Sequence, residues 1–224
     1  MHTLTRYGFS NVICGFFAFP TAHARRILPS DLEPIELHHD SAVFSMTVFD
    51  FTHSETGAYR EVVMAVIVAP LLKRGEPMPK AAFYPYLVAT NTRAARDHAI
   101  QRWHLPHWKS DVDIQFHAQQ GQLSALVTAD DAPVAELAVT DHSWEPVAHR
   151  YQSFMRDDAR LYQARVTMQG ELCEHEEETG RLRLHRHPFN RSLSIEDIDE
   201  RPFREQWMRD GLQTFEPLET LREA

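Results

Sequence analysis

The run Val62-Val63-Met64-Ala65-Val66-Ile67-Val68-Ala69 is the most apolar stretch of the sequence and indicates its fold class. Glu61 precedes this run and Pro70 follows it, so its length suits a strand and is far short of the ~20 apolar residues that a membrane span needs. A short run of β-branched residues between such boundaries is typical of a strand buried on both faces. We therefore predict a strand-rich domain built around this segment.

Strand patterns, separated by turn residues, occur on both sides of the run. They lie at 11–19, 41–51, 82–90, 112–117, 123–129, 134–139, 161–170 and 180–187. Helix patterns lie at 22–28 and 91–102, a loop is expected at 73–80, and the acidic tail 195–208 is predicted to be helical or irregular and to wrap the other elements. Short strands without βαβ alternation indicate a mainly β (α+β) fold, an antiparallel sheet system closed into a barrel or double sheet.

Composition limits the classes of function. The net charge of -9 argues against a nucleic-acid partner, because no basic surplus is present to neutralise phosphates. Only two cysteines occur, with no disulfide or metal spacing, which favours a reduced, cytoplasmic location. The sequence shows no repeat and no flexible linker, so we predict one domain over residues 1–224, with no membrane partner.

Two stretches are informative because of their order and spacing. The first is a helix-and-return segment at 24–34, followed by the strand at 42–50 and by Tyr59-Arg60-Glu61; the second is Trp103-His104-Leu105-Pro106. Together they resemble the acetoacetate decarboxylase superfamily over roughly residues 10 to 140. The resemblance implies a large, strongly curved antiparallel β-barrel with a central cavity. It also implies a homo-oligomer, since members of the family assemble.

The resemblance can be tested residue by residue. In the decarboxylases of this family, a lysine follows that proline and forms a Schiff base with the β-keto acid, activated by a second lysine. In this chain His107 and Trp108 occupy those two positions. Ala18 falls where the family carries an arginine thought to meet the substrate carboxylate, whereas Glu61 falls on a glutamate that points into the cavity. The resemblance therefore supports the barrel and argues against the imine reaction.

The three lysines of the chain also argue against an imine. Lys73 and Lys80 lie in the predicted loop, where a lysine keeps its ordinary pKa and stays protonated. Lys109 lies two residues past the family position, in a segment that resembles an exposed turn with Asp111 as a counter-charge. We expect none of them to act as a nucleophile.

Glu61 and His107 are the candidate catalytic residues. A carboxyl in an apolar cavity and a histidine could exchange protons with a small carbonyl or keto-acid compound in a non-covalent, lyase-type reaction such as enolisation, dehydration or retro-aldol cleavage. Tyr59, Trp103 and Trp108 are expected to contact the substrate. Two alternatives stay open. His107 could simply bond a loop carbonyl while Glu61 pairs with an arginine such as Arg60 or Arg102, and the barrel could bind a ligand without turnover.

No cofactor and no metal are predicted. Phosphate-binding loops and hydrolase elbows are absent from the sequence. His104 and His107 are separated by Pro106, which breaks helical geometry, and no acidic residue stands at metal-ligand spacing nearby. The acidic segment 173–178 is interpreted as a charged hairpin tip.

Overall fold

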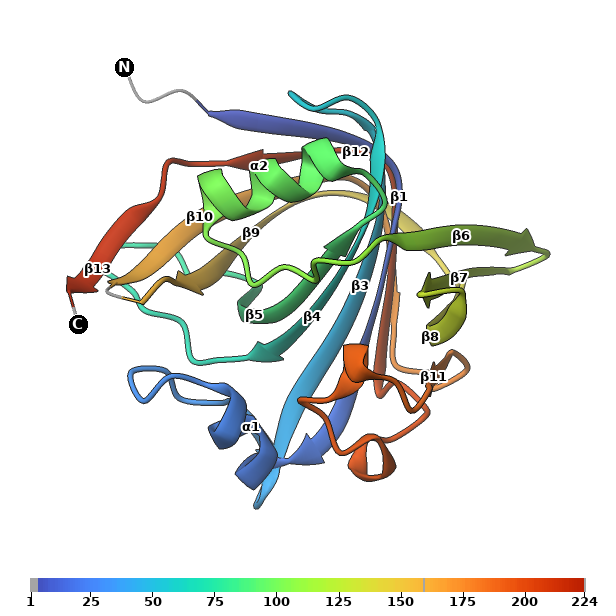
Figure 1. Cartoon of the computed structure of the whole chain (residues 1–224), viewed down its shortest axis with the longest axis horizontal. Helices are drawn as coiled ribbons and strands as arrows, with labels where there is room; N and C mark the ends of the chain where they lie inside the picture. The colour runs from blue at the N-terminus through green and yellow to red at the C-terminus, as the bar shows by residue number, and fades with distance from the viewer. Residues whose placement is uncertain (1–3, 159, 224) are drawn as a thin grey trace.

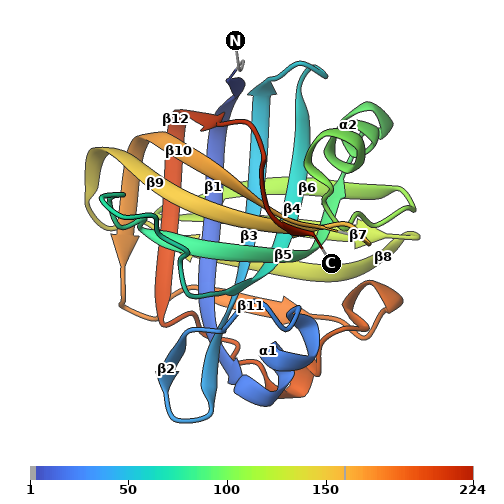
Figure 2. The ribbon, with the colours of Figure 1, turned by 90° about the vertical axis from the view of Figure 1, so that its left-hand side faces the viewer.

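The apolar run after Glu61 forms most of β4, one of seven strands that close into a barrel (Figures 1 and 2). The computed structural model describes residues 4–158 and 160–223. The strand order is β1-β12-β10-β9-β5-β4-β3, and β3 pairs with β1 to complete the ring. The barrel strands are β1 Thr5–Pro20, β3 Ser41–His53, β4 Tyr59–Ile67, β5 Ala81–Thr90, β9 Trp144–Arg156, β10 Arg160–His175 and β12 Arg204–Phe215. Short strands β2 (Glu36–His38) and β13 (Glu219–Glu223) pair with β3 and β10.

A second sheet packs against the outside of the barrel wall. Its order is β11-β8-β7-β6, with bounds β6 Val112–Gln119, β7 Gln122–Ala129, β8 Ala132–Thr140 and β11 Arg181–Leu184. Alternate residues of β4, including Val62, Met64 and Val66, share one buried core with Val127 and Leu137 of this sheet. Glu61 and Val63, which alternate with these residues, face the barrel interior. The prediction that this strand is buried on both faces is confirmed.

Two α-helices accompany the strands, α1 (Thr21–Ile27) and α2 (Arg93–Trp103), with short 3-10 turns at Pro188–Asn190 and Ile195–Asp197. Thr92 caps α2, because its side-chain oxygen accepts a hydrogen bond from the Ala95 N–H at 3.3 Å. His104 then adopts a left-handed conformation (φ 52°), which ends the helix and turns the chain. None of the helices in the described part of the chain is long and apolar enough to cross a membrane.

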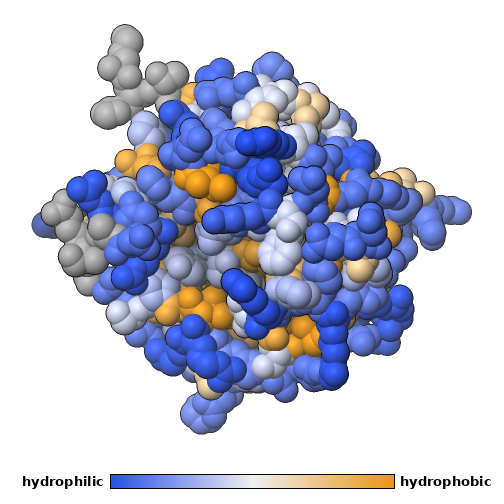
Figure 3. Space-filling model, in the orientation of Figure 1, coloured by the Kyte–Doolittle hydropathy of each residue, from blue (hydrophilic) through white to orange (hydrophobic). Residues whose placement is uncertain are grey.

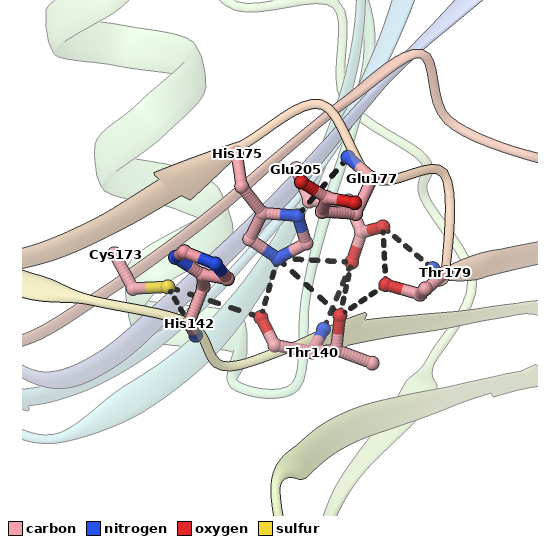
Figure 4. A network of polar contacts seen from close by, with 8 residues as sticks. Thr140, His142, Cys173, His175, Glu177, Thr179 and Glu205 are labelled. Carbon is pink, nitrogen blue, oxygen red and sulfur yellow. Dashed lines mark hydrogen bonds and ion pairs between the residues drawn. The ribbon is translucent and has the colours of Figure 1, made fainter.

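A buried carboxylate joins the barrel to the second sheet (Figure 4). Glu205 of β12 is fully buried and accepts hydrogen bonds from the N–H groups of Thr140 (2.8 Å) and Gly180 (2.6 Å). His175 Nε2 lies 3.8 Å from the same carboxylate and 2.9 Å from the Thr140 carbonyl oxygen. The segment after β10 therefore connects two sheets. It is not the tip of a hairpin, because β11 pairs with β8 and not with β10.

The surface carries few large apolar side chains. The face in Figure 3 is mostly hydrophilic, with separate apolar areas between the charged residues. Among the described residues the most exposed large apolar side chain is Met78, in the loop predicted at 73–80. Scattered exposures of this kind are normal for a folded protein and do not mark a docking site.

Four strands, β2, β9, β12 and β13, and one pairing differ from the sequence-based expectation. The tail predicted to be helical or irregular contributes β12, a full member of the barrel between β1 and β10. β9 was not predicted, because its first half carries exposed charged residues and Pro146. β5 and β9 pair in parallel over 81–83 and 151–153, so the barrel is not wholly antiparallel. The mainly β class and the closed barrel are confirmed.

Candidate functional site

The interior of the barrel holds a cavity of about 120 Å³ that is partly open to the outside. All seven barrel strands contribute to its wall, and Trp103 and Leu105 complete it at the end of α2. Most of the wall is apolar, for example Phe49, Phe83 and Phe215. Since a dry apolar cavity of roughly 150 Å³ can take up benzene, this cavity suits a small organic molecule.

Glu61 is the one carboxyl group among the described residues that line the cavity. Strand alternation turns it and Val63 inward while Val62 faces the outer core. Glu61 is 9% exposed. Its carboxyl forms no hydrogen bond and no ion pair with any other described residue. Burial raises its pKa to about 8, so the group is poised to exchange a proton close to neutral pH.

The two arginines considered as partners of Glu61 bond elsewhere. Arg60 Nε lies 3.0 Å from Asp50 Oδ1, and Arg60 also donates to the Ile114 carbonyl oxygen at 2.8 Å. Arg102 donates to Thr5 Oγ1 at 3.0 Å. The carboxyl of Glu61 is therefore not neutralised by either arginine.

A hydrogen-bonded chain of aromatic residues stands beside Glu61. Trp103 Nε1 donates to the Tyr7 hydroxyl at 2.8 Å, and that hydroxyl lies 2.9 Å from His98 Nε2. Burial raises the pKa of Tyr7 and of Tyr59, and the negative charge of Glu61 adds to both shifts, so these groups lie within electrostatic range of one another. Tyr59 is buried against Phe51 and does not itself line the cavity. Its contact with a substrate stays a prediction.

His107 lies near this site but outside the cavity wall. Its Nδ1 is 2.7 Å from the Trp108 carbonyl oxygen, and its Nε2 is 3.3 Å from the hydroxyl of Thr90. Thr90 is the cross-strand neighbour of Glu61, which puts one residue between the two predicted catalytic groups. Burial lowers the pKa of His107 and keeps the ring neutral near pH 7.

Trp108, predicted to contact the substrate, also lies outside the wall. Residues 106–108 run beside β5, where the Val88 N–H donates to the Pro106 carbonyl and the Trp108 N–H donates to the Val88 carbonyl. Neighbouring side chains of such an extended segment point to opposite sides. The Trp108 ring therefore packs in the core between the barrel and the second sheet, 5.4 Å from Phe189.

No lysine lines the cavity among the described residues. Lys109 is exposed, and its carbonyl oxygen accepts a hydrogen bond from Arg96. Lys73 forms an ion pair with Glu219, and Lys80 Nζ lies 2.7 Å from Glu174 Oε1.

The described residues also contain no group of three or more histidine, cysteine, aspartate or glutamate side chains placed to hold a metal ion.

Of the predicted site residues, Glu61 and Trp103 stand on the wall of one cavity. Sequence reasoning missed Tyr7, His98 and Gln213, a lining residue of β12. The sequence did carry a signal for Tyr7, because Thr5, Tyr7 and Phe9 alternate with Arg6 and Gly8 as in a strand. The strand was nevertheless predicted to begin only at residue 11. No comparable signal marked Gln213, because β12 was not recognised as a strand.

Comparison with known proteins gives a structural likeness alone. No family model matches the sequence, and no curated protein matches it. The structure is similar to that of an acetoacetate decarboxylase, with a TM-score of 0.69 and 13% identity over 100% of this chain and 91% of the other. Acetoacetate decarboxylase from Legionella pneumophila gives 0.66 and 14% over 97% and 87%. The enduracididine biosynthesis enzyme MppR, solved with pyruvate, gives 0.66 and 12% over 100% and 92%. At such identities the likeness shows the fold.

Proposed function

We propose that this chain, which has the acetoacetate decarboxylase-like fold, acts on a small carbonyl or keto-acid compound in its barrel cavity by non-covalent, lyase-type acid/base chemistry. The observation that supports this most is the Glu61 carboxyl, which is buried, lines the cavity and has a pKa raised to about 8. A structure of MppR with pyruvate supports a small carbonyl ligand for a barrel of this shape. The cytoplasmic location and the homo-oligomer stay predictions.

The elementary step is proton transfer at the carbon beside the carbonyl. The Glu61 carboxylate takes a proton from that carbon, the C–H electron pair becomes the C=C bond of an enolate, and the carbonyl electron pair moves to oxygen. Return of a proton from the carboxyl to carbon completes an exchange, and loss of a leaving group instead gives elimination or cleavage. A carboxylate whose pKa lies above its usual range is a stronger base, which favours the first step.

The alternative is a barrel that binds a small carbonyl compound without turnover. The position of His107 favours it, because the histidine does not line the cavity and no other carboxyl or histidine among the described residues joins Glu61 there. The two functions predict the same occupant of the cavity and differ in whether its protons exchange.

Proton exchange in D₂O separates the two. We expect the protein to accelerate the loss of the α C–H signals of butanone, which proton NMR follows. Borohydride added to the same mixtures is expected to leave the protein mass unchanged, because none of the described residues that line the cavity is a lysine. Binding without exchange would favour the alternative, and a reduced adduct on Lys109 would show that an imine forms after all.

A further inference from the structure

We infer that the ligand of this cavity is an uncharged ketone, ester or amide, held through its carbonyl oxygen, and not the carboxylate of a keto acid. The inference narrows the proposed function and rests on it for the location of the ligand. Three features of the wall lead to it: the polar groups left without a partner, the lack of positive charge, and the surroundings of Glu61.

Three polar side chains on the cavity wall have no hydrogen-bond partner among the described residues: Glu61, Tyr151 and Gln213. They are 9%, 7% and 8% exposed, so each residue is largely buried, and all three line the cavity. Buried polar groups are nearly always hydrogen-bonded in folded proteins, and groups that are not call for a ligand or ordered water. These three groups therefore indicate a ligand that has hydrogen-bonding atoms of its own.

The other polar groups on the wall are already engaged. Thr47 donates to Cys14 Sγ at 3.1 Å, and Ser153 donates to Met155 Sδ at 3.3 Å. The Gln152 amide bonds both the N–H (3.0 Å) and the carbonyl (2.8 Å) of Leu71. Gln206 donates to Glu174. The three partnerless groups therefore define where a ligand can be recognised.

None of the described residues that line the cavity is positively charged. Two cations lie near the wall, and both are engaged elsewhere. Lys80 is paired with Glu174, the carboxylate that accepts a hydrogen bond from the lining residue Gln206. Arg102 lies over the Trp103 ring at 5.3 Å and donates to Thr5. A ligand carboxylate would lose its hydration without gaining a cation, which is a large cost in an apolar cavity.

The surroundings of Glu61 oppose a second negative charge. Tyr7 faces it from β1 and Tyr59 from β4, while Trp103 and His98 of α2 bond to Tyr7. None of these groups carries a positive charge near neutral pH, because burial also lowers the pKa of His98. Once the Glu61 carboxyl ionises, its negative charge would repel an anionic ligand, because none of these neighbouring groups supplies a positive charge to screen it.

Tyr151 and Gln213 fit a carbonyl oxygen. A phenol hydroxyl and an amide NH₂ are neutral donors, and burial keeps Tyr151 in its protonated form by raising its pKa. Gln213 is the cross-strand neighbour of Tyr7, which places it on the side of the cavity near Glu61. With the carbonyl held by such donors, the carbon beside it can face the Glu61 base.

The test compares acetoacetamide with acetoacetate, which differ in the charge of one end and have nearly the same shape. A third compound, n-butylammonium, serves as a cationic probe. We expect ligand-observed NMR titrations at pH 6.5 to show that acetoacetamide binds about tenfold or more tightly than acetoacetate and than n-butylammonium. Gln213→Leu is expected to weaken acetoacetamide binding by about three- to tenfold, the effect of one lost hydrogen bond. Glu136→Gln, on the second sheet, should leave all three dissociation constants unchanged.

The pH dependence gives a second readout. Because ionisation of Glu61 adds a negative charge to the cavity, acetoacetate should bind still more weakly as pH rises through about 8, and Glu61→Gln should abolish that fall. Acetoacetate or butylammonium bound as tightly as acetoacetamide would overturn the inference and leave the proposed function standing. Selective binding of acetoacetamide without proton exchange in butanone would support the inference and contradict the proposed function.

Discussion

Glu61→Gln is expected to lower the protein-dependent rate of α-proton exchange by about 10²–10⁴-fold, the usual contribution of a positioned acid or base. Glutamine keeps the shape of the side chain and fills the same place on the wall, but its amide cannot take a proton from carbon. The fold should persist, since Glu61 makes no hydrogen bond or ion pair with a described residue that the substitution would break. The check is the exchange rate measured by proton NMR in D₂O. The variant and the unchanged protein should first be shown to unfold at the same urea concentration.

Two comparison variants make the result specific. Glu136→Gln removes a carboxylate from the second sheet, where Glu136 is half-exposed and lies 3.5 Å from Arg183, and is expected to leave the rate unchanged. His107→Ala is expected to lower the rate less than tenfold, because His107 reaches Glu61 only through Thr90. A loss in His107→Ala as large as that in Glu61→Gln would instead assign the histidine a direct part in proton transfer.

Glu205→Ala is expected to lower the free energy of unfolding by about 3–5 kcal/mol, the cost of removing one partner from a buried charged network. Its carboxylate is fully buried and accepts the N–H groups of Thr140 and Gly180, which belong to different segments (Figure 4). Alanine would leave both donors buried without a partner and open a cavity where β12 meets β8. Urea unfolding monitored by circular dichroism measures the change.

Glu200→Ala is the matched control for this variant. Glu200 pairs with Arg181 at 3.0 Å, but both side chains are well exposed. Exposed pairs contribute little, so the expected change is within about 0.5 kcal/mol. Equal destabilisation by the two substitutions would mean that the Glu205 network does not hold the second sheet to the barrel.

The fold was readable from the sequence wherever apolar residues follow a strand pattern. The run at Val62 and the alternation at 41–51 become β4 and β3 because one face packs on the second sheet and the other on the barrel interior. β12 was not predicted as a strand because some of its inward positions are polar. Its inward positions include Gln206 and Gln213, since they face a cavity and not a solid core. Parallel pairing of β5 with β9 depends on contacts far apart in sequence, which no local pattern specifies.

The site was predictable only in part. Glu61 was found through the resemblance, in which a glutamate at this position points into the cavity, and the register of β4 turns it inward. Trp103, His107 and Trp108 are close in sequence, yet the left-handed turn at His104 and the pairing of 106–108 beside β5 direct them to different places. Proximity along the chain could not tell which of them faces the cavity.

The pKa of Glu61 tests the central claim most directly. Carbon-13 NMR of the side-chain carboxyls, with the Glu61 resonance identified by its loss in Glu61→Gln, would follow the titration of this one group. A carboxyl buried in the cavity wall without a counter-ion should titrate with a midpoint of about 8. A midpoint near 4.5, the ordinary value for glutamate, would show a solvated or ion-paired side chain and would contradict the account.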